Sequence, residues 1–229
     1  MPVIARDDDQ SLEEVCVVIA SVPLERNQHV DDQRAGELAA RRCPDPYPYP
    51  WPHLIIDDFL PSAVLAQALA EINADTYHFD IEQRGTGRIE YSLLKSEAMW
   101  RAIYSRRMVS ILNSAFAVKV KLNKHNMLQL RRMNDDTPAF PLHHDFTINH
   151  DAIASFLYLS SGWSSKCGGR LHLYESGTDS APSASVDPIK NRFVAFQSKP
   201  SHWHSVERVY GWERISVLSL WDVDGAAGS

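Results

Sequence analysis

The sequence predicts an α+β protein whose β part is a jelly roll or a β-sandwich. Before residue 117, apolar residues recur at helical spacing in two segments, and after residue 117 they alternate with a period of two. Turn signals such as Gly168-Gly169 and Asp187-Pro188 separate the alternating segments. The chain has 229 residues, of which 44% are hydrophobic and 23% charged, so it can bury a core of this size.

The first 46 residues differ from the rest and are expected to form an N-terminal extension. A helix is predicted at residues 33–42, and the apolar run at 15–20 fits either a strand or a short helix. Prolines then occupy nearly every second position in residues 43–52, which requires an extended backbone. We expect this Pro-rich strap to lie on the surface and to lead into one domain over residues 47–229.

The helical part of the domain begins at residue 53. Residues 53–60 have the pattern of a short strand, and Pro61 and Ser62 mark the start of a helix. Residues 79–91 contain two glycines and mixed charge, so a mobile loop is expected there, either a lid over the site or a solvated surface loop. A second, longer helix is predicted at residues 96–115.

The β part is predicted from alternation alone. The expected strands are 117–122, 127–133, 140–145, 152–159, 170–174, 193–196, 204–209 and 213–221. A chain with two helices followed by short strands of this kind packs the helices on one sheet.

Composition excludes several classes of protein. The net charge of −6 argues against binding along a nucleic-acid backbone, and no apolar run approaches the roughly 20 residues of a membrane helix. The first ten residues are acidic and do not resemble a secretory signal. Three widely spaced cysteines are typical of reduced thiols. We therefore expect a cytoplasmic monomer or homodimer that binds neither nucleic acid nor membranes.

Three residues suggest a metal site. His143 and Asp145 form an H-x-D pair at a strand end, and His204 follows 59 residues after Asp145. Residues i and i+2 of a strand share a face, and two imidazoles with one carboxylate suit non-haem Fe(II) with open positions. For the dipeptide alone, a surface His–Asp hydrogen bond is the simpler interpretation. His144 and His202 lie close to these ligands in the sequence, so the sequence does not settle which histidine of each strand faces the metal.

A cation beside this site favours the metal interpretation. Arg214 and Ser216 share one face of an apolar strand, ten residues after His204. A buried guanidinium needs an anionic partner, and it binds a carboxylate through two parallel hydrogen bonds. The partner could be a protein carboxylate or that of a bound ligand.

The sequence from Pro141 to Trp221 resembles the iron(II)/2-oxoglutarate-dependent oxygenases, especially their prolyl-4-hydroxylase-like branch. The matching motifs, in order, are Pro-Leu-His143-His-Asp145, Phe-Leu-Tyr158-Leu-Ser, Gly168-Gly-Arg-Leu-His-Leu-Tyr174, Phe193-Val-Ala-Phe196, His204-Ser-Val and Arg214-Ile-Ser216. The segment 53–61 resembles the opening strand and helix start of the family, so the resemblance covers about residues 50–223.

The resemblance implies a double-stranded β-helix of the cupin-like jelly-roll type, with Fe(II) on His143, Asp145 and His204. It implies 2-oxoglutarate and O₂ as cosubstrates. It further implies that Arg214 and Ser216 bind the far carboxylate of 2-oxoglutarate, with Tyr158 nearby. Where many relatives have a tyrosine ten residues before the first metal histidine, this chain has Met133. The corresponding hydrogen bond is then missing, or it comes from Gln129 or Arg131.

These features predict a dioxygenase that oxidises an unactivated C–H bond of a small molecule. Acidic residues in segment 79–91 favour a polar or cationic metabolite, such as a sugar, an aminoglycoside or an amino-acid-derived biosynthetic intermediate, which is hydroxylated or cyclised. The candidate substrate contacts are Asp80, Glu82, Arg84, Arg88 and Arg131. One alternative is a peptidyl, prolyl-type hydroxylase. Another, of a different class, is a non-redox jelly-roll protein that binds zinc.

Overall fold

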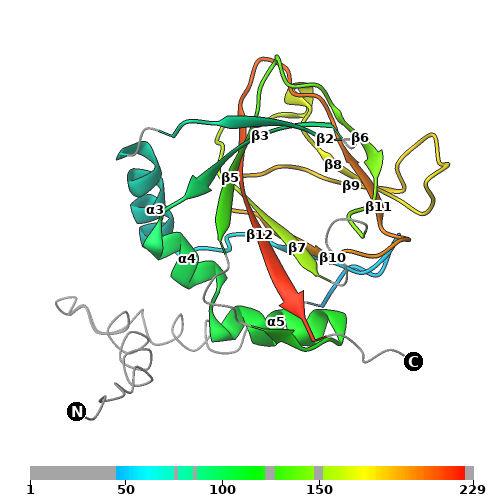
Figure 1. Cartoon of the computed structure of the whole chain (residues 1–229), viewed down its shortest axis with the longest axis horizontal. Coiled ribbons are helices and arrows are strands. Elements are labelled where there is room, and N and C mark those ends of the chain that lie inside the picture. The colour runs from blue at the N-terminus through cyan, green and yellow to red at the C-terminus, as the bar shows by residue number, and fades with distance from the viewer. Residues whose placement is uncertain (1–44, 75–76, 85–86, 122–126, 147–151, 225–229) are drawn as a thin grey trace, which may run out of the picture. The chain divides into compact units, whose positions relative to one another are not determined.

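The computed structural model in Figure 1 describes residues 45–74, 77–84, 87–121, 127–146 and 152–224. The helix and the apolar segment expected before residue 45 lie outside these ranges, and the extension over residues 1–46 stays a prediction.

The described helices are α3 (Ser62–Ala74), α4 (Glu97–Ile103), α5 (Arg106–Phe116) and a 3₁₀ turn, η1 (Ser165–Cys167). The strands are β1 (His53–Ile56), β2 (Asp80–Arg84), β3 (Gly87–Leu94), β4 (Val120–Lys121), β5 (Leu128–Met133), β6 (Phe140–His143), β7 (Ile153–Tyr158), β8 (Leu171–Tyr174), β9 (Ala184–Val186), β10 (Phe193–Gln197), β11 (Trp203–Val206) and β12 (Arg214–Val223). Each of the eight predicted strands therefore has a counterpart, with shifted ends.

The strands form two antiparallel sheets. The larger has the order β1-β10-β7-β12-β5-β3-β2, with β4 also paired to β12, and the smaller has the order β6-β11-β8-β9. Neighbouring strands are mostly distant in sequence, as in a jelly roll. The predicted double-stranded β-helix is therefore confirmed.

Alternation along the strands of the larger sheet separates two apolar clusters. Val217 and Trp221 of β12 belong to a cluster with the helix residues Met99, Ile103 and Leu112. On β7, Ala154 and Tyr158 belong instead to a second cluster, with Leu171 and Leu173 of the smaller sheet. The helices thus cover one face of the larger sheet, and the smaller sheet packs on the other. None of the described helices is long and apolar enough to cross a membrane.

The single helix expected at residues 96–115 is wrong, because the chain breaks it into α4 and α5. Tyr104 leaves the helical conformation, and its hydroxyl donates to the backbone oxygens of Met127 and Leu220. Ser105 then caps α5, since its side chain accepts a hydrogen bond from the Met108 amide. The apolar residues keep their helical spacing across the break, so the sequence pattern does not show that the helix is interrupted.

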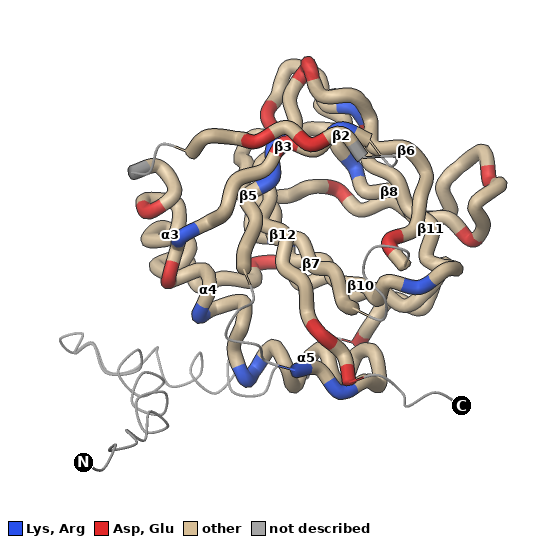
Figure 2. The backbone as a smooth tube through the Cα atoms, in the orientation of Figure 1, with Lys and Arg blue, Asp and Glu red and all other residues tan. Residues whose placement is uncertain are grey.

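The loop expected at residues 79–91 is also wrong. Its described residues form the antiparallel hairpin β2–β3, which extends the larger sheet beyond β5. Both signs of charge occur along this hairpin (Figure 2). The charged residues made this segment look like a loop in the sequence. Strands of an edge hairpin can carry such residues because one side of the hairpin is open to water. A hairpin paired to the sheet gives no support to a mobile lid.

The described part of the Pro-rich strap is exposed along most of its length, but Trp51 anchors its end. Trp51 is 5% exposed, its ring stacks on His202 and meets the edge of Phe196, and its Nε1 donates to the Tyr174 oxygen at 3.0 Å. The tryptophan therefore fixes the end of the strap to the smaller apolar cluster.

We expect Ser105→Ala to lower the free energy of unfolding by about 1 kcal/mol, because α5 loses its N-cap. Ser105→Asp should retain most of the stability. Urea unfolding measures the difference, and Ser110→Ala on the exposed side of α5 is the matched control, which should change stability little. Equal stability of the Ser105→Ala variant and the wild type would contradict the assignment of the cap.

Candidate active site

The three predicted metal ligands lie together. Pairing of β6 with β11 places the Cα atoms of His143 and His204 opposite each other, and the ring centroids are 4.2 Å apart. Asp145 follows the end of β6, and its carboxylate oxygens lie 3.6 Å from His143 Nε2 and 3.7 Å from His204 Nε2. One ligand atom from each residue falls within 4.8 Å of the others. Asp145 is reached by a bend after the strand and not by strand alternation.

Hydrogen bonds orient both imidazoles. His143 Nδ1 lies 2.7 Å from the Pro141 oxygen, and His204 Nδ1 lies 3.0 Å from the His202 oxygen. A carbonyl oxygen only accepts, so Nδ1 carries the proton in each ring, and the lone pair is on Nε2. Both lone pairs are then available toward the Asp145 carboxylate, as a metal-binding site needs.

The electrostatics favour the protonation states that bind a metal. Burial lowers the pKa of His204 to about 4, although the Asp145 charge opposes this, so the imidazole stays neutral at pH 7. Burial raises the pKa of Asp145, but the facing imidazoles of His143 and His204 and the charge of Arg131 outweigh it and lower the pKa overall. A neutral imidazole and an ionised carboxylate are both ready to act as ligands.

Neither neighbouring histidine joins this group. His202 precedes β11, its Nδ1 donates to the Gln197 oxygen at 2.7 Å, and its ring stacks on Trp51. The His144 ring packs edge-on against Trp203 at 4.6 Å. The structure thereby settles the register that the sequence left open.

Arg214 lies buried in the same pocket, and it is 5% exposed. Its Nη2 is 3.4 Å from the Tyr158 hydroxyl, its Nη1 is 3.8 Å from Met133 Sδ, and its Cζ lies 4.9 Å from the centroid of the Tyr158 ring. Ser216 is fully buried, and its Cα pairs with that of Tyr158. Three of the residues predicted at the cosubstrate, Arg214, Ser216 and Tyr158, are therefore neighbours.

This end of the pocket fits a carboxylate ligand. Arg214 Nε and Ser216 Oγ are buried without a hydrogen-bond partner in the described part of the chain. Buried polar atoms of this kind are rare, and each needs an explanation such as a bound group. A carboxylate of 2-oxoglutarate supplies acceptors for both.

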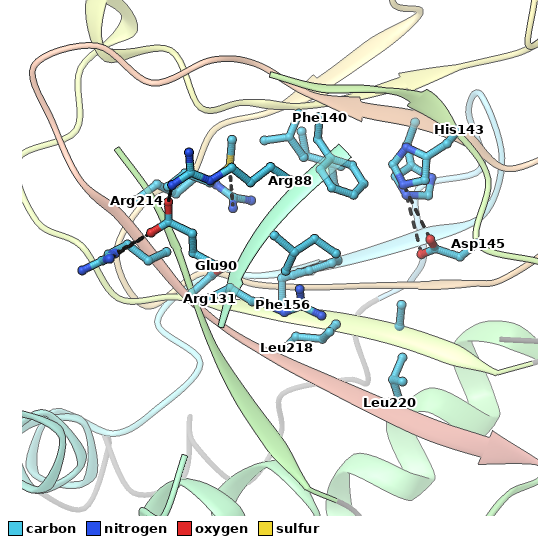
Figure 3. A pocket seen from close by; sticks show the side chains of 18 residues that line it. Arg88, Glu90, Arg131, Phe140, His143, Asp145, Phe156, Arg214, Leu218 and Leu220 are labelled. Atoms are coloured by element: carbon cyan, nitrogen blue, oxygen red, sulfur yellow. Dashed lines mark hydrogen bonds and ion pairs between the residues drawn. The ribbon is translucent and has the colours of Figure 1, made fainter. Parts of the chain in front are cut away.

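The pocket lies between the two sheets and extends from Arg214 to the His–Asp–His group (Figure 3). Its apolar wall consists of Ile89, Met133, Phe140, Ala154, Phe156, Leu171, Val206, Leu218 and Leu220. Leu218 and Leu220 lie on the same face of β12 as Arg214 and Ser216. The period of two along this strand is therefore enough to predict that they share a side with the cosubstrate residues.

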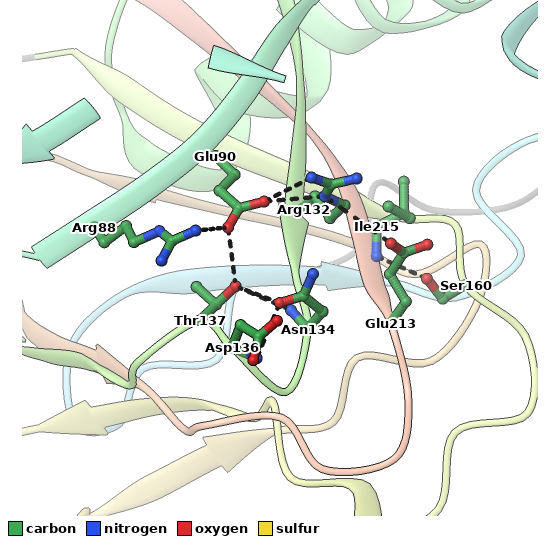
Figure 4. Close-up of polar contacts among 9 residues, drawn as sticks. All are labelled: Arg88, Glu90, Arg132, Asn134, Asp136, Thr137, Ser160, Glu213 and Ile215. Atoms are coloured by element: carbon green, nitrogen blue, oxygen red, sulfur yellow. Dashed lines mark hydrogen bonds and ion pairs between the residues drawn. The ribbon is translucent and has the colours of Figure 1, made fainter. Parts of the chain in front are cut away.

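A buried carboxylate, that of Glu90, holds two arginines at the pocket edge, so this acidic residue of segment 79–91 is already paired within the protein (Figure 4). Glu90 is 2% exposed. Arg132 binds its Oε2 through Nε at 3.0 Å and Nη2 at 2.9 Å, and Arg88 Nη2 binds Oε1 at 2.7 Å. Two guanidinium groups on one buried carboxylate satisfy its charge.

The other predicted contacts divide into two groups. Arg88 and Arg131 line the pocket, whereas Asp80 is exposed on β2, and neither it nor Glu82 is among the lining residues. The Arg84 side chain lies outside the described residues. Gln129 is on β5, but it does not line this pocket.

Comparison with known proteins agrees with this geometry. Residues 128–221 match the model of the 2OG-Fe(II) oxygenase superfamily. A search of curated protein sequences finds no match.

Solved structures with the same fold include a Pseudomonas putida prolyl-4-hydroxylase, with TM-score 0.60 and 18% identity over 76% of this chain and 93% of that chain. A prolyl hydroxylase from Trichoplax adhaerens, in complex with a hypoxia inducible factor peptide, has TM-score 0.57 and 18% identity over 75% and 83%. The non-heme alpha ketoglutarate dependent epimerase SnoN from nogalamycin biosynthesis has TM-score 0.56 and 14% identity over 87% and 93%.

The chain therefore carries, over residues 128–221, a match to the 2OG-Fe(II) oxygenase superfamily. It is a 2-oxoglutarate-dependent dioxygenase, and the family implies Fe(II), 2-oxoglutarate and O₂.

We expect His143→Ala, Asp145→Ala and His204→Ala each to abolish Fe(II) binding in an anaerobic titration, because each removes one of three ligands. His144→Ala and His202→Gln are the matched controls and should retain binding, since both rings have other partners. Loss of iron in a control, with retention in the adjacent ligand variant, would show that the ligands are assigned wrongly.

Acid should destabilise the metal-free protein. Between pH 6.5 and about pH 4 the unfolded His204 takes up a proton that the folded imidazole does not bind, so the free energy of unfolding falls as the pH falls. Urea unfolding across this range should show a smaller slope for His204→Gln than for the wild type. The slope should not vanish, because burial also lowers the pKa of His53 and His202. Identical slopes would contradict the buried neutral state of His204.

Proposed function

We propose that this dioxygenase oxidises an unactivated C–H bond of a small metabolite, by hydroxylation or oxidative ring closure, with Fe(II) on His143, Asp145 and His204. One observation carries the proposal. The His–Asp–His group and the buried Arg214–Ser216 pair occupy one pocket, where two donors lack partners among the described residues. A purely structural zinc site gives no reason for a buried cation of this kind.

The chain's own residues divide the work of holding the reactants. Arg214 and Ser216 donate to the distal carboxylate of 2-oxoglutarate, and Tyr158 supports Arg214 through its hydroxyl and its ring. The bound ion supplies, together with 2-oxoglutarate and O₂, the oxidising power that protein side chains lack.

The apolar wall has a separate task. Phe140 packs edge-on against the His143 ring at 4.7 Å, and Phe156, Leu218 and Leu220 line the pocket below. These side chains exclude water from the reacting carbon and hold an apolar part of the substrate. Contacts that hold the substrate near the His–Asp–His group also orient its reacting carbon toward that group.

A small substrate is supported by the position of the pocket between the sheets. The pocket is walled by side chains from both, which suits a molecule that enters the barrel. One structural relative is an epimerase from a biosynthetic pathway, and two are prolyl hydroxylases. These three proteins are similar to this chain in fold, so the substrate is inferred here from the residues that line the pocket.

We expect Arg214→Gln to weaken 2-oxoglutarate binding by tens to thousands of times, since losing one partner of a buried charge pair costs about 2–5 kcal/mol. Anaerobic titration of the Fe(II) protein with 2-oxoglutarate, followed by the metal-to-ligand absorption band, measures the change. Arg208→Gln is the control, because Arg208 is exposed and bonds the Asp135 oxygen.

The same titration separates the proposal from its alternative. An absorption band that requires both Fe(II) and 2-oxoglutarate supports the oxygenase site. The proposal fails if no band forms while zinc binds tightly, or if Arg214→Gln leaves the affinity for 2-oxoglutarate unchanged.

A further inference from the structure

Two contacts from outside the pocket hold the His204 ring. The Phe196 ring of β10 packs against it, with centroids 4.9 Å apart and an interplanar angle of 57°. The hydrogen bond from His204 Nδ1 to the His202 oxygen, 3.0 Å long, is the second contact. Both Phe196 and His202 are buried, and neither is among the described residues that line the pocket. The support of this predicted ligand therefore comes from residues that no substrate touches.

Trp51 of the Pro-rich strap contacts both of these supports. Its ring stacks on the His202 ring, with centroids 4.6 Å apart and an interplanar angle of 13°. It also meets the edge of the Phe196 ring, with centroids 5.4 Å apart and an angle of 63°. His202 precedes β11 and Phe196 lies on β10, so one indole joins the two segments that hold His204.

Trp51 is itself held at both ends. Its Nε1 donates to the Tyr174 oxygen at 3.0 Å, and its backbone oxygen accepts from His53 Nδ1 at 2.9 Å. Tyr47 and His53 close the strap around it, because their backbones exchange hydrogen bonds of 2.8 and 3.1 Å and their rings stack at 5.4 Å. The strap therefore presents the indole at a fixed place in the smaller apolar cluster.

The affinity of a metal site depends on support of this kind. An imidazole can turn about two side-chain bonds, and the Nε2 lone pair of His204 binds an ion only while it points toward Asp145. Residues that fix a ligating imidazole from outside the ligand set are worth roughly 10- to 100-fold in metal affinity.

We propose that Trp51 is a positioning residue for the metal centre. It holds Phe196 and the His202 backbone in the places from which they orient His204. The inference rests on the proposed function, because it takes His204 as a ligand of Fe(II). It makes the end of the Pro-rich strap a part of the active site, although Trp51 does not line the pocket.

Anaerobic titration with Fe(II) tests the proposal. Trp51→Leu should weaken Fe(II) binding about tenfold, because leucine has no flat ring to pack on His202 and Phe196. Trp51→Phe should stay within about threefold of the wild type, because an aromatic ring remains. Phe196→Leu should reproduce the loss, since it removes the ring that contacts His204.

A spectroscopic measurement separates positioning from a general loss of stability. Co(II) bound in place of Fe(II) reports the geometry of its ligands through its visible absorption bands. These bands should change in Trp51→Leu and keep the wild-type form in Trp51→Phe. If Trp51→Leu does not fold, Trp51→Met takes its place, because the flexible side chain adapts to the space and should show the same loss of Fe(II) affinity.

Phe193→Leu is the matched control, because Phe193 is a fully buried ring on the same strand as Phe196. It stacks on Phe59, in the apolar cluster that includes the helix residues. Urea unfolding should show a loss of stability similar to that of Phe196→Leu. Its Fe(II) affinity should nevertheless stay within about twofold of the wild type.

Two results overturn the inference. One is an Fe(II) affinity of the folded Trp51 variant within about twofold of the wild type, with unchanged Co(II) bands. The other is an equal loss of Fe(II) affinity in Phe193→Leu. With a normal Fe(II)–2-oxoglutarate band in the wild type, either result means that this inference fails alone. If the wild type binds no Fe(II), this inference and the proposed function both fail.

Discussion

The antiparallel pairing of β6 with β11 is the constraint on which the site depends. It brings His143 and His204 face to face across 60 intervening residues and aims both Nε2 atoms at Asp145. The same strands belong to the smaller sheet, whose packing against the larger one creates the pocket. A slip by one residue would turn each side chain to the opposite face and separate the ligands from Arg214. Register, more than any single contact, therefore defines the centre.

Much of this arrangement could be predicted from the sequence. Alternation located the eight strands, and ligand chemistry selected His143, Asp145, His204 and Arg214, which the fold brings into one pocket. The prediction failed where local pattern and tertiary pairing disagree. The charged hairpin β2–β3 is stabilised by pairing with β5, which no local period reveals, and Tyr104 interrupts a helix without changing its apolar stripe.

The electrostatics of the pocket depend on more than composition. The acidic residues of segment 79–91 favour a polar or cationic substrate in the sequence, but the effect of each depends on which way its side chain points. Glu90 faces two arginines and is neutralised by them, whereas Asp80 is exposed on the hairpin. The charge of a pocket is set by the residues that line it and by their partners. These partners are determined by how the strands pair, which the composition of the segment does not show.

The division of β12 into two faces has a consequence for evolution. Val217 and Trp221 belong to the core beneath the helices, whereas Ser216, Leu218 and Leu220 line the pocket. Selection for stability and selection for substrate choice thus act on alternate positions of one strand. Mutations at Leu218 or Leu220 can reshape the cavity while the helix-side core stays intact, so a lineage can acquire new substrates without losing its fold.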